Sequence, residues 1–326
     1  MTTMLESLHR SRDAITPAMR AALDRLDAST RKQAAYHLGW IDVDGRPTAS
    51  HGKAVRPALA LLSAQAAGGP EEIGLPGAVA VELVHNFSLL HDDYMDRDLE
   101  RRHRRTVWAV WGPSSAILTG DALLALAQEV LLDSGLPTAA PAALRLARAT
   151  RELIRGQVQD LAFEQRDRVT LPECVDMAGG KTGALMSASA AIGAVLAGAP
   201  EATVDGLATF GAQLGLAFQL VDDVLGIWGD PAVTGKPVHS DLRAHKKSLP
   251  VTYALEQGAD IDPGDDEESV RRAAEAVEAA GGRDWALAEA ERRLALGEAA
   301  LGRLDLPGRV RDELFALGRF MIDREV

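Results

Sequence analysis

Two long apolar segments of this chain each end in a pair of neighbouring aspartates. The first leads into Asp92-Asp93-Tyr94-Met95-Asp96 and the second into Asp222-Asp223. Residues four apart lie on one face of a helix, so Asp92 and Asp96 point the same way, with Asp93 beside them. A buried carboxylate is costly unless a positive charge compensates it. The pattern therefore predicts buried helices whose charged ends bind a ligand.

The side chains of both clusters indicate which ligand. They offer carboxylate oxygens without a nearby set of Cys or His, which suits a hard divalent cation such as Mg²⁺. Basic residues follow both clusters, namely Arg101, Arg102, Arg104 and Arg105 after the first, and Lys236, Lys246 and Lys247 after the second. Guanidinium groups make paired hydrogen bonds to phosphate. Carboxylates, a metal and flanking cations together indicate a diphosphate substrate.

Helical periodicity recurs along the chain, and no segment alternates apolar and polar residues between hairpin turns, so we predict an all-α protein without strands. The predicted helices are 17–38, 54–68, 74–97, 115–133, 137–165, 171–198, 201–229, 245–256, 267–281, 284–303 and 307–323. The segments 74–91 and 205–221 are apolar on most faces, which is typical of helices buried in a large bundle. Facing helices of a bundle can hold a metal site between them. We expect one domain over 1–326, with a deep apolar cavity and an acidic cluster on each of two facing helices near its mouth.

Composition excludes several classes of protein. A formal net charge of −12 argues against nucleic-acid binding, which needs a basic face. The lone Cys174 rules out an intramolecular disulfide and fits a reducing compartment. The N-terminus lacks the apolar core of a signal peptide. The longest apolar stretch, 184–199, is shorter than the roughly 20 residues of a membrane span. We therefore expect a soluble, cytoplasmic protein without a membrane span.

Nine short motifs follow one another between residues 52 and 250. They are GlyLys..ArgPro at 52–57, His85, AspAsp..Asp at 92–96, ArgArg at 101–102, GlyGln..AspLeu at 156–161, LysThr at 181–182, Gln..AspAsp at 219–223, GlyLysPro at 235–237 and Lys..LeuPro at 246–250. Any one motif is modest evidence, whereas the ordered set is specific. With these motifs in this order, the chain resembles the trans-isoprenyl diphosphate synthases of the polyprenyl synthetase family.

The resemblance implies an isoprenoid-synthase type helical bundle around a central cavity, in which Mg²⁺ bridges the aspartates and an allylic diphosphate. It implies metal-binding roles for Asp92, Asp93, Asp96, Asp222 and Asp223. The allylic diphosphate would be held by Arg101, Lys181 and Lys236, supported by Thr182, Gln219 and Lys246. The diphosphate of isopentenyl diphosphate would be held by Lys53, Arg56, His85 and Arg102. The family expectation for assembly is a homodimer.

The implied reaction is a head-to-tail condensation of isopentenyl diphosphate with an allylic diphosphate (dimethylallyl, geranyl or farnesyl). Phe87 lies five positions before Asp92, just over one helical turn deeper, with Ser88 beside it. Bulky residues at this depth limit the product length in the family. An aromatic there resembles synthases that make geranylgeranyl diphosphate (C20), and farnesyl diphosphate (C15) is the nearest alternative.

Three positions depart from the family pattern. Gly226 replaces the last aspartate of the second motif, Arg105 stands where proline is usual, and His239 stands where glycine is usual. Gly226 puts one metal ligand in doubt, and His239 adds bulk near Lys236.

Three other functions are open to such a sequence. A terpene cyclase on the same architecture would have no use for the second set of diphosphate-binding residues, Lys53, Arg56 and His85. A metal-dependent phosphohydrolase, suggested by His91-Asp92, would leave Lys181-Thr182 unexplained. A non-catalytic subunit of a heteromeric synthase has only Gly226 and His239 in its favour.

Overall fold

The structure is a computed structural model that describes residues 2–48, 52, 54–231, 238–262, 264 and 266–323. The chain divides into two compact units. Unit 1 comprises 1–147, 188–205 and 306–314, and unit 2 comprises 148–187, 206–305 and 315–326. The first acidic cluster belongs to unit 1 and the second to unit 2.

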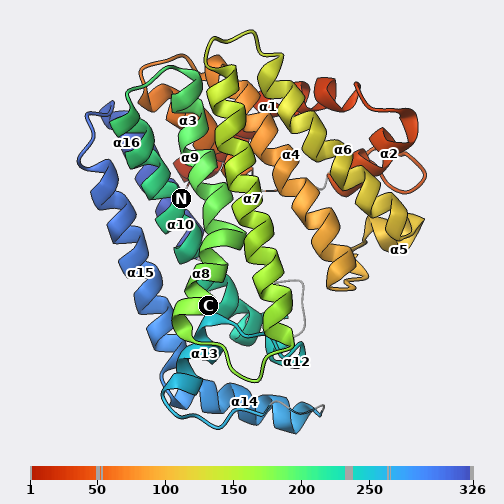
Figure 1. Ribbon diagram of the computed structural model, residues 1–326, viewed down its shortest axis with the longest axis vertical. Helices are drawn as coiled ribbons and strands as arrows, with labels where there is room; N and C mark the ends of the chain where they lie inside the picture. Colours follow the sequence, from red (N-terminus) through yellow and green to blue (C-terminus); the bar gives the residue numbers. More distant parts are fainter. Residues whose placement is uncertain are drawn as a thin grey trace. The chain divides into compact units, whose positions relative to one another are not determined.

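Unit 1 is built around α4 (Glu71–Met95), the helix that ends in the first acidic cluster. It packs mainly against α3 (Val55–Ala66) and α6 (Pro113–Leu132), and Figure 1 shows α4 alongside α6. The other elements wholly in this unit are α1 (Thr2–Leu23), α2 (Ala28–His37), β1 (Glu100–Arg101), β2 (Arg104–Arg105) and α5 (Val107–Trp111).

Unit 2 contains α8 (Leu171–Ala178), the π-helix η1 (Gly179–Gly183), α12 (Ser240–Arg243), α13 (Leu249–Glu256), α14 (Glu267–Ala279) and α15 (Gly282–Leu301). Here α13 packs against α8, α14 and α15. Four further helices contribute residues to both units, namely α7 (Ala139–Glu164), α9 (Ala184–Leu196), α10 (Glu201–Trp228) and α16 (Gly308–Ile322).

Local sequence signals explain where several helices begin. Asp27 caps α2, because its carboxylate accepts hydrogen bonds from the backbone N–H groups of Ser29 and Thr30. Thr170 and Glu173 form a capping box at the start of α8. Each cap satisfies N–H groups that have no partner within their helix.

The predicted all-α fold class is confirmed, and most predicted helices match observed ones within a few residues. The single helix predicted at 17–38 is wrong. The first helix, α1, ends at Leu23, and a second helix, α2, begins after Asp27. The helix predicted at 171–198 is interrupted by the π-helix η1. The absence of strands is also wrong, since β1 and β2 pair as an antiparallel hairpin. Two-residue strands are too short to show an alternating pattern. The single domain over 1–326 remains a prediction.

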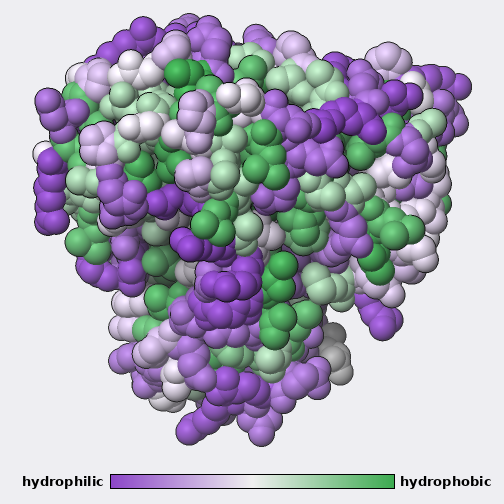
Figure 2. Space-filling model, turned by 45° about the horizontal axis from the view of Figure 1, so that its top comes forward, coloured by the Kyte–Doolittle hydropathy of each residue, from purple (hydrophilic) through white to green (hydrophobic). Residues whose placement is uncertain are grey.

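Three of the helices are long and apolar. By length and composition, α4, α6 and α10 are each long and apolar enough to cross a membrane, although the sequence predicted no such segment. Apolarity in α4 serves packing, because thirteen of its residues are buried. On the face shown in Figure 2, hydrophilic residues lie between the hydrophobic ones.

Candidate active site

The C-terminal end of α4 presents the first acidic cluster. Asp92 is partly exposed and Asp96, the C-cap, is exposed, and the backbone N–H of Asp96 donates to the carbonyl of Asp92 at 2.8 Å. Asp93 is 1% exposed, and its Oδ1 accepts a hydrogen bond from Nε of Arg101 at 2.5 Å. Its Oδ2 is buried without a partner. Burial raises the pKa of Asp93 to about 6, although Arg101 opposes that shift. Asp92 and Asp96 therefore lie towards solvent, whereas Asp93 is tied to Arg101.

A tight hairpin carries the two arginines predicted to bind diphosphates. In it Glu100 pairs with Arg105 and Arg101 with Arg104, and the two turn residues, Arg102 and His103, have φ angles of 52° and 59°. Two left-handed residues in a row suit a two-residue hairpin turn, but Asn-Gly is the usual sequence there. Such strain in residues other than glycine is concentrated at functional sites.

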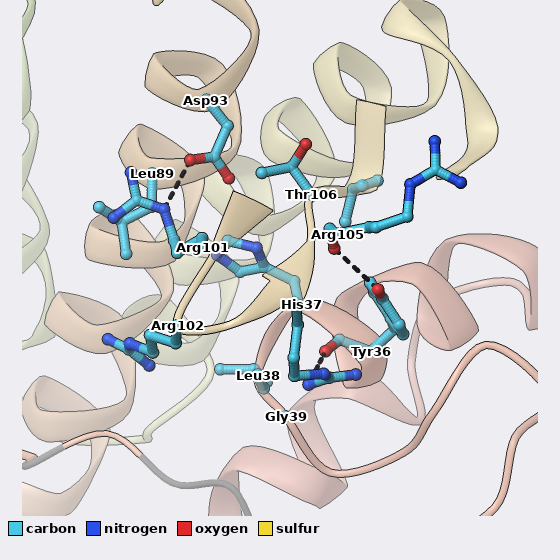
Figure 3. A pocket seen from close by; sticks show the side chains of 12 residues that line it. Tyr36, His37, Leu38, Gly39, Leu89, Asp93, Arg101, Arg102, Arg105 and Thr106 are labelled. Atoms are coloured by element: carbon cyan, nitrogen blue, oxygen red, sulfur yellow. Dashed lines mark hydrogen bonds and ion pairs between the residues drawn. The ribbon is translucent and has the colours of Figure 1, made fainter. Parts of the chain in front are cut away.

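The four arginines of this hairpin differ in role. Arg104 donates to the carbonyls of Tyr36 and Ile41 at 3.0 and 2.7 Å, so it anchors the hairpin to the end of α2 and to the segment that follows. Arg105 donates to the carbonyl of Ala109. Figure 3 shows Arg101 and Arg102 extending towards α4 and Arg105 extending the opposite way. Only Arg101 and Arg102 therefore lie towards the acidic cluster.

A pocket lies beside this hairpin (Figure 3). Its lining includes Asp93, Arg101, Arg102 and His37 of α2. Burial and the nearby positive charges of Arg101, Arg102 and Arg104 lower the pKa of His37 to about 3. The imidazole is therefore neutral at pH 7, and the surrounding guanidinium groups leave the pocket suited to an anion.

A second group of cations lies around His85 in unit 1. Burial, followed by the positive charges of Arg56, Arg102 and Arg101, holds the pKa of His85 well below its usual value. Burial also lowers the pKa of Arg56, which the carboxylate of Glu82 opposes. Nε of Arg56 is buried without a hydrogen-bond partner. The structure thus brings together three of the residues predicted to hold isopentenyl diphosphate, while Lys53 lies outside the described residues.

Glu82 is the anionic member of this group. It lines a pocket together with Gly52, Asn86 and Arg102. A Cβ on Gly52 would lie 3.4 Å from Nη1 of Arg102, so the backbone at Gly52 approaches that guanidinium closely. The charged residues that line this pocket are Arg12, Arg102 and Glu82, so its net charge is positive, which favours an anionic ligand.

The other predicted substrate-binding residues lie in unit 2. Lys181 belongs to the π-helix η1, and its Nζ lies 2.5 Å from Oδ2 of Asp160 on α7. The ammonium of Lys181 is therefore paired with a carboxylate. Single-turn π-helices often mark functional sites.

A hydrogen-bonded chain links the next four predicted residues. Oγ1 of Thr182 donates to Oε1 of Gln219 at 2.7 Å, and Nε2 of Gln219 donates to Oδ1 of Asp223 at 2.8 Å. Nζ of Lys246 lies 3.5 Å from the same oxygen. Oδ2 of Asp223 accepts the backbone N–H of Leu249 at 2.9 Å. Asp223 is 3% exposed and both of its carboxylate oxygens accept hydrogen bonds, whereas its neighbour Asp222 is exposed.

Lys246 is charged in this surrounding. Burial alone would lower the pKa of its ammonium, but the carboxylates of Asp223, Asp241 and Asp160 outweigh burial and hold that pKa well above the usual value. Lys236 lies outside the described residues. His239, at φ 62°, adopts the left-handed backbone that favours glycine, which explains why glycine suits this position.

The predicted product-length residue is in place below the first cluster. Phe87 is 5% exposed and lies edge-on against the ring of His91, with 4.8 Å between centroids. Nε2 of His91 lies 3.1 Å from the carbonyl of Ile117 on α6. The aromatic pair is thus fixed between α4 and α6.

The carboxylates fit a magnesium ion that is bound together with substrate. Among the described residues, no three His, Cys, Asp or Glu side chains lie close enough to hold a metal by themselves. Mg²⁺ usually retains waters and binds through one or two carboxylates plus substrate phosphates, so no preformed cage is required. The donors are all oxygens, and Oδ2 of Asp93 is available for a partner. The metal roles of the five aspartates remain predictions.

Sequence reasoning missed several residues that build this site. Asp160 pairs with Lys181, Glu82 accompanies Arg56, and His37 faces the arginine hairpin. The side chain of Gln157 is 6% exposed, and neither amide atom has a partner. Gln157 and Asp160 lie in the GlyGln..AspLeu motif, so that motif could have identified them, whereas nothing in the local sequence distinguishes His37.

Comparison with known proteins gives a consistent result. A family model described as polyprenyl synthetase matches residues 46–287. The chain is 50% identical to (2E,6E)-farnesyl diphosphate synthase of Mycobacterium tuberculosis and 42% identical to geranylgeranyl diphosphate synthase of the same organism. Each alignment covers 98% of this chain and 93% of the relative. The crystal structure of a polyprenyl synthetase from Streptomyces coelicolor A3(2) matches with a TM-score of 0.92 and 52% identity, covering 97% of this chain and 99% of that one.

Proposed function

Because the chain belongs to the polyprenyl synthetase family of trans-isoprenyl diphosphate synthases, we propose that it makes geranylgeranyl diphosphate from isopentenyl diphosphate and allylic diphosphates. It is a prenyltransferase, and its relatives make short-chain products. The family is generally Mg²⁺-dependent, and we propose Mg²⁺ as the cofactor here.

One observation supports a reaction of two substrates: each of the two units contains its own set of cations. Arg56 and Arg102 accompany His85 in unit 1, while Lys181 and Lys246 are held by carboxylates in unit 2. Each set suits one diphosphate. A cyclase acts on a single diphosphate, so the unit 1 set favours a condensing enzyme over a cyclase.

The proposed mechanism starts with the allylic diphosphate. Its diphosphate group is bound by Lys181, Lys236 and Arg101, with Lys246 in support. These cations stabilise the negative charge that develops on the leaving group as the C–O bond breaks. Magnesium bound by Asp92, Asp93, Asp96, Asp222 and Asp223 would add Lewis-acid stabilisation of that charge. The hydrogen bond between Thr182 and Gln219 holds η1, and with it Lys181, against α10.

Condensation then joins the two substrates. Lys53, Arg56, His85 and Arg102 hold isopentenyl diphosphate so that its double bond attacks C1 of the allylic cation. A proton then leaves the resulting cation, and the departed diphosphate is the proposed base. An apolar surrounding at the reacting carbon would keep out water, which would otherwise quench the cation.

Product length is assigned from Phe87. Its ring is buried and packed against His91, which α6 holds in place, so it can act as a firm floor below Asp92. The second candidate product is farnesyl diphosphate, and the 50% identity to a farnesyl diphosphate synthase favours it.

Incubation of the purified protein with Mg²⁺, isopentenyl diphosphate and dimethylallyl, geranyl or farnesyl diphosphate, followed by mass analysis, tests this function. Growth to C20 supports the proposal, and growth that stops at C15 supports the second candidate. Hydrocarbons formed without isopentenyl diphosphate would indicate a cyclase. Absence of turnover until a homologous subunit is added would indicate a non-catalytic subunit.

We also propose a cytoplasmic homodimer. Large apolar side chains stay exposed along α6, with Leu118 at 65% and Leu132 at 54%, and burial against a second copy would remove them from water. Light scattering coupled to gel filtration measures the mass; a monomer at micromolar concentration would contradict this proposal.

A further inference from the structure

The second acidic motif lacks a carboxylate at its last position. Gly226 follows Asp222 by four residues and Asp223 by three on α10, so a side chain at 226 would share their helix face. The sequence alone therefore leaves this face with two aspartates.

Another aspartate occupies the space of the missing side chain. A Cβ built on Gly226 would lie 2.4 Å from Oδ2, 2.5 Å from Cγ and 2.7 Å from Oδ1 of Asp241. Ordinary van der Waals contact begins at 3.4 Å. The carboxylate of Asp241, on α12, therefore lies where a side chain of residue 226 would begin.

Three contacts hold Asp241 in this position. Oγ of Ser240 donates to the carbonyl of Gly226 at 3.2 Å, which attaches α12 to α10. The backbone N–H of Lys246 donates to the carbonyl of Asp241 at 2.9 Å. Nζ of Lys246 lies 3.5 Å from Oδ2 of Asp241 and 3.5 Å from Oδ1 of Asp223. One ammonium thus joins the carboxylate from α12 to the buried carboxylate of α10.

We propose that Asp241 supplies the third carboxylate of the second acidic cluster in place of the residue missing at position 226, and that it helps to bind the divalent cations of the diphosphate complex. This inference rests on the proposed function, because it concerns the metal-diphosphate complex of that reaction. Glycine at 226 is part of the arrangement, since any side chain there would meet Asp241. In place of the aspartate that the family pattern has at position 226 of α10, this chain therefore uses an aspartate of α12.

Metal binding can be measured without turnover. Mn²⁺ titrated into the full-length protein with inorganic diphosphate is followed by electron paramagnetic resonance, which counts the free ion. The variants are Asp241→Ala, which removes all three crowding atoms, and the double variant Gly226→Asp/Asp241→Ala, which returns the carboxylate to α10. Asp305→Ala is the control. The control residue lies far from the site. Asp305 follows Leu304, whose side chain contacts α10 at Gly206. Gly206 is sixteen residues before Asp222, which is about 24 Å along the helix at 1.5 Å per residue.

Asp241→Ala should weaken Mn²⁺ binding about tenfold, which is the scale seen when a group that supports a metal site is lost. The double variant should return to within about threefold of the wild type, and Asp305→Ala should bind as the wild type does. Wild-type affinity in folded Asp241→Ala would overturn the proposal, as would a double variant that folds but does not regain affinity. If Asp241→Ala does not fold, Asp241→Asn keeps the shape, removes the charge and should show the same loss.

The product assay separates the two levels of inference. A wild type that condenses no substrates fails as a prenyl diphosphate synthase, whatever its Mn²⁺ affinity. An active wild type whose Mn²⁺ binding does not depend on Asp241 retains the proposed function and refutes only the metal-binding role of that carboxylate.

Discussion

Gly156 controls how closely the π-helix η1 approaches α7, so its replacement should displace the lysine that grips the allylic diphosphate. A Cβ at Gly156 would lie 2.2 Å from the backbone nitrogen of Lys181 and 2.8 Å from the carbonyl carbon of Gly180. Ordinary contact begins at 3.4 Å, so the backbone of η1 must move by 3.4 − 2.2 = 1.2 Å in Gly156→Ala. A backbone atom cannot rotate away as a side-chain tip can.

The expected cost follows from this displacement. Crowding a packed helix contact costs about 1–3 kcal/mol of folding free energy. A shift of about 1 Å in a substrate-positioning group can cost roughly a hundredfold in rate. The hydrogen bonds from Lys181 to Asp160 and from Thr182 to Gln219 would be disturbed together. We therefore expect a lower Tm and kcat/KM reduced about a hundredfold, measured by thermal unfolding and by incorporation of labelled isopentenyl diphosphate.

Gly179→Ala is the matched control in the same π-helix. Gly179 has a helical φ of −59°, and a Cβ there would meet nothing within 4 Å. Alanine should therefore leave activity unchanged and raise stability by up to about 1 kcal/mol. Normal kcat/KM and Tm in Gly156→Ala, or an equal loss of activity in Gly179→Ala, would refute the close-approach argument.

Further predictions concern the cluster, the product floor and two histidines. Asp92→Ala should cut turnover at least about a hundredfold with an unchanged circular dichroism spectrum; a folded variant with near-normal turnover would remove Asp92 from the metal site. Phe87→Ala should yield products longer by one or more isoprene units and cost about 3 kcal/mol of folding free energy; an unchanged product spectrum would place the floor elsewhere. His37 has a lowered pKa of about 3, so the unfolded chain gains its proton first as pH falls below 6.5, and the stabilisation by neutral His37 is lost towards pH 3. Between pH 7 and pH 5 the wild type should lose at most about 2 kcal/mol more than His37→Gln in urea unfolding, and equal losses would contradict this. His239→Gly should raise stability by about 0.5–1 kcal/mol, because glycine relieves the left-handed backbone, and a lower Tm would show that the imidazole contributes more than the strain costs.

The close agreement between predicted and observed helices has a simple cause. In α4 and α10 the apolar residues continue for many turns, and burial of such a stretch is favourable only as a helix packed on several sides. The boundary between α1 and α2 was missed, although Asp27 followed by Ser29 and Thr30 is a recognisable cap. The hairpin at 100–105 was missed because its turn residues, Arg102 and His103, are not the usual ones.

The residue types of the site were predictable because chemistry restricts them. Carboxylates for a hard cation and Arg or Lys for a diphosphate appear in the sequence at recognisable spacings, and the order of the motifs identified the family. Contacts between distant segments were not predictable. The sequence around Lys181 does not indicate that Asp160 is its partner, and the sequence around Lys246 does not indicate Asp223.

Apolar periodicity and side-chain chemistry are local properties, so the helical class, the family and most candidate ligands could be predicted from the sequence. Which charged groups meet depends instead on the packing of distant segments. That packing turned Asp93 towards Arg101, assigned Arg104 to anchoring the hairpin, and placed the carboxylate of Asp241 over Gly226. These outcomes depend on how closely two backbones approach, and that distance is set by packing between segments far apart along the chain.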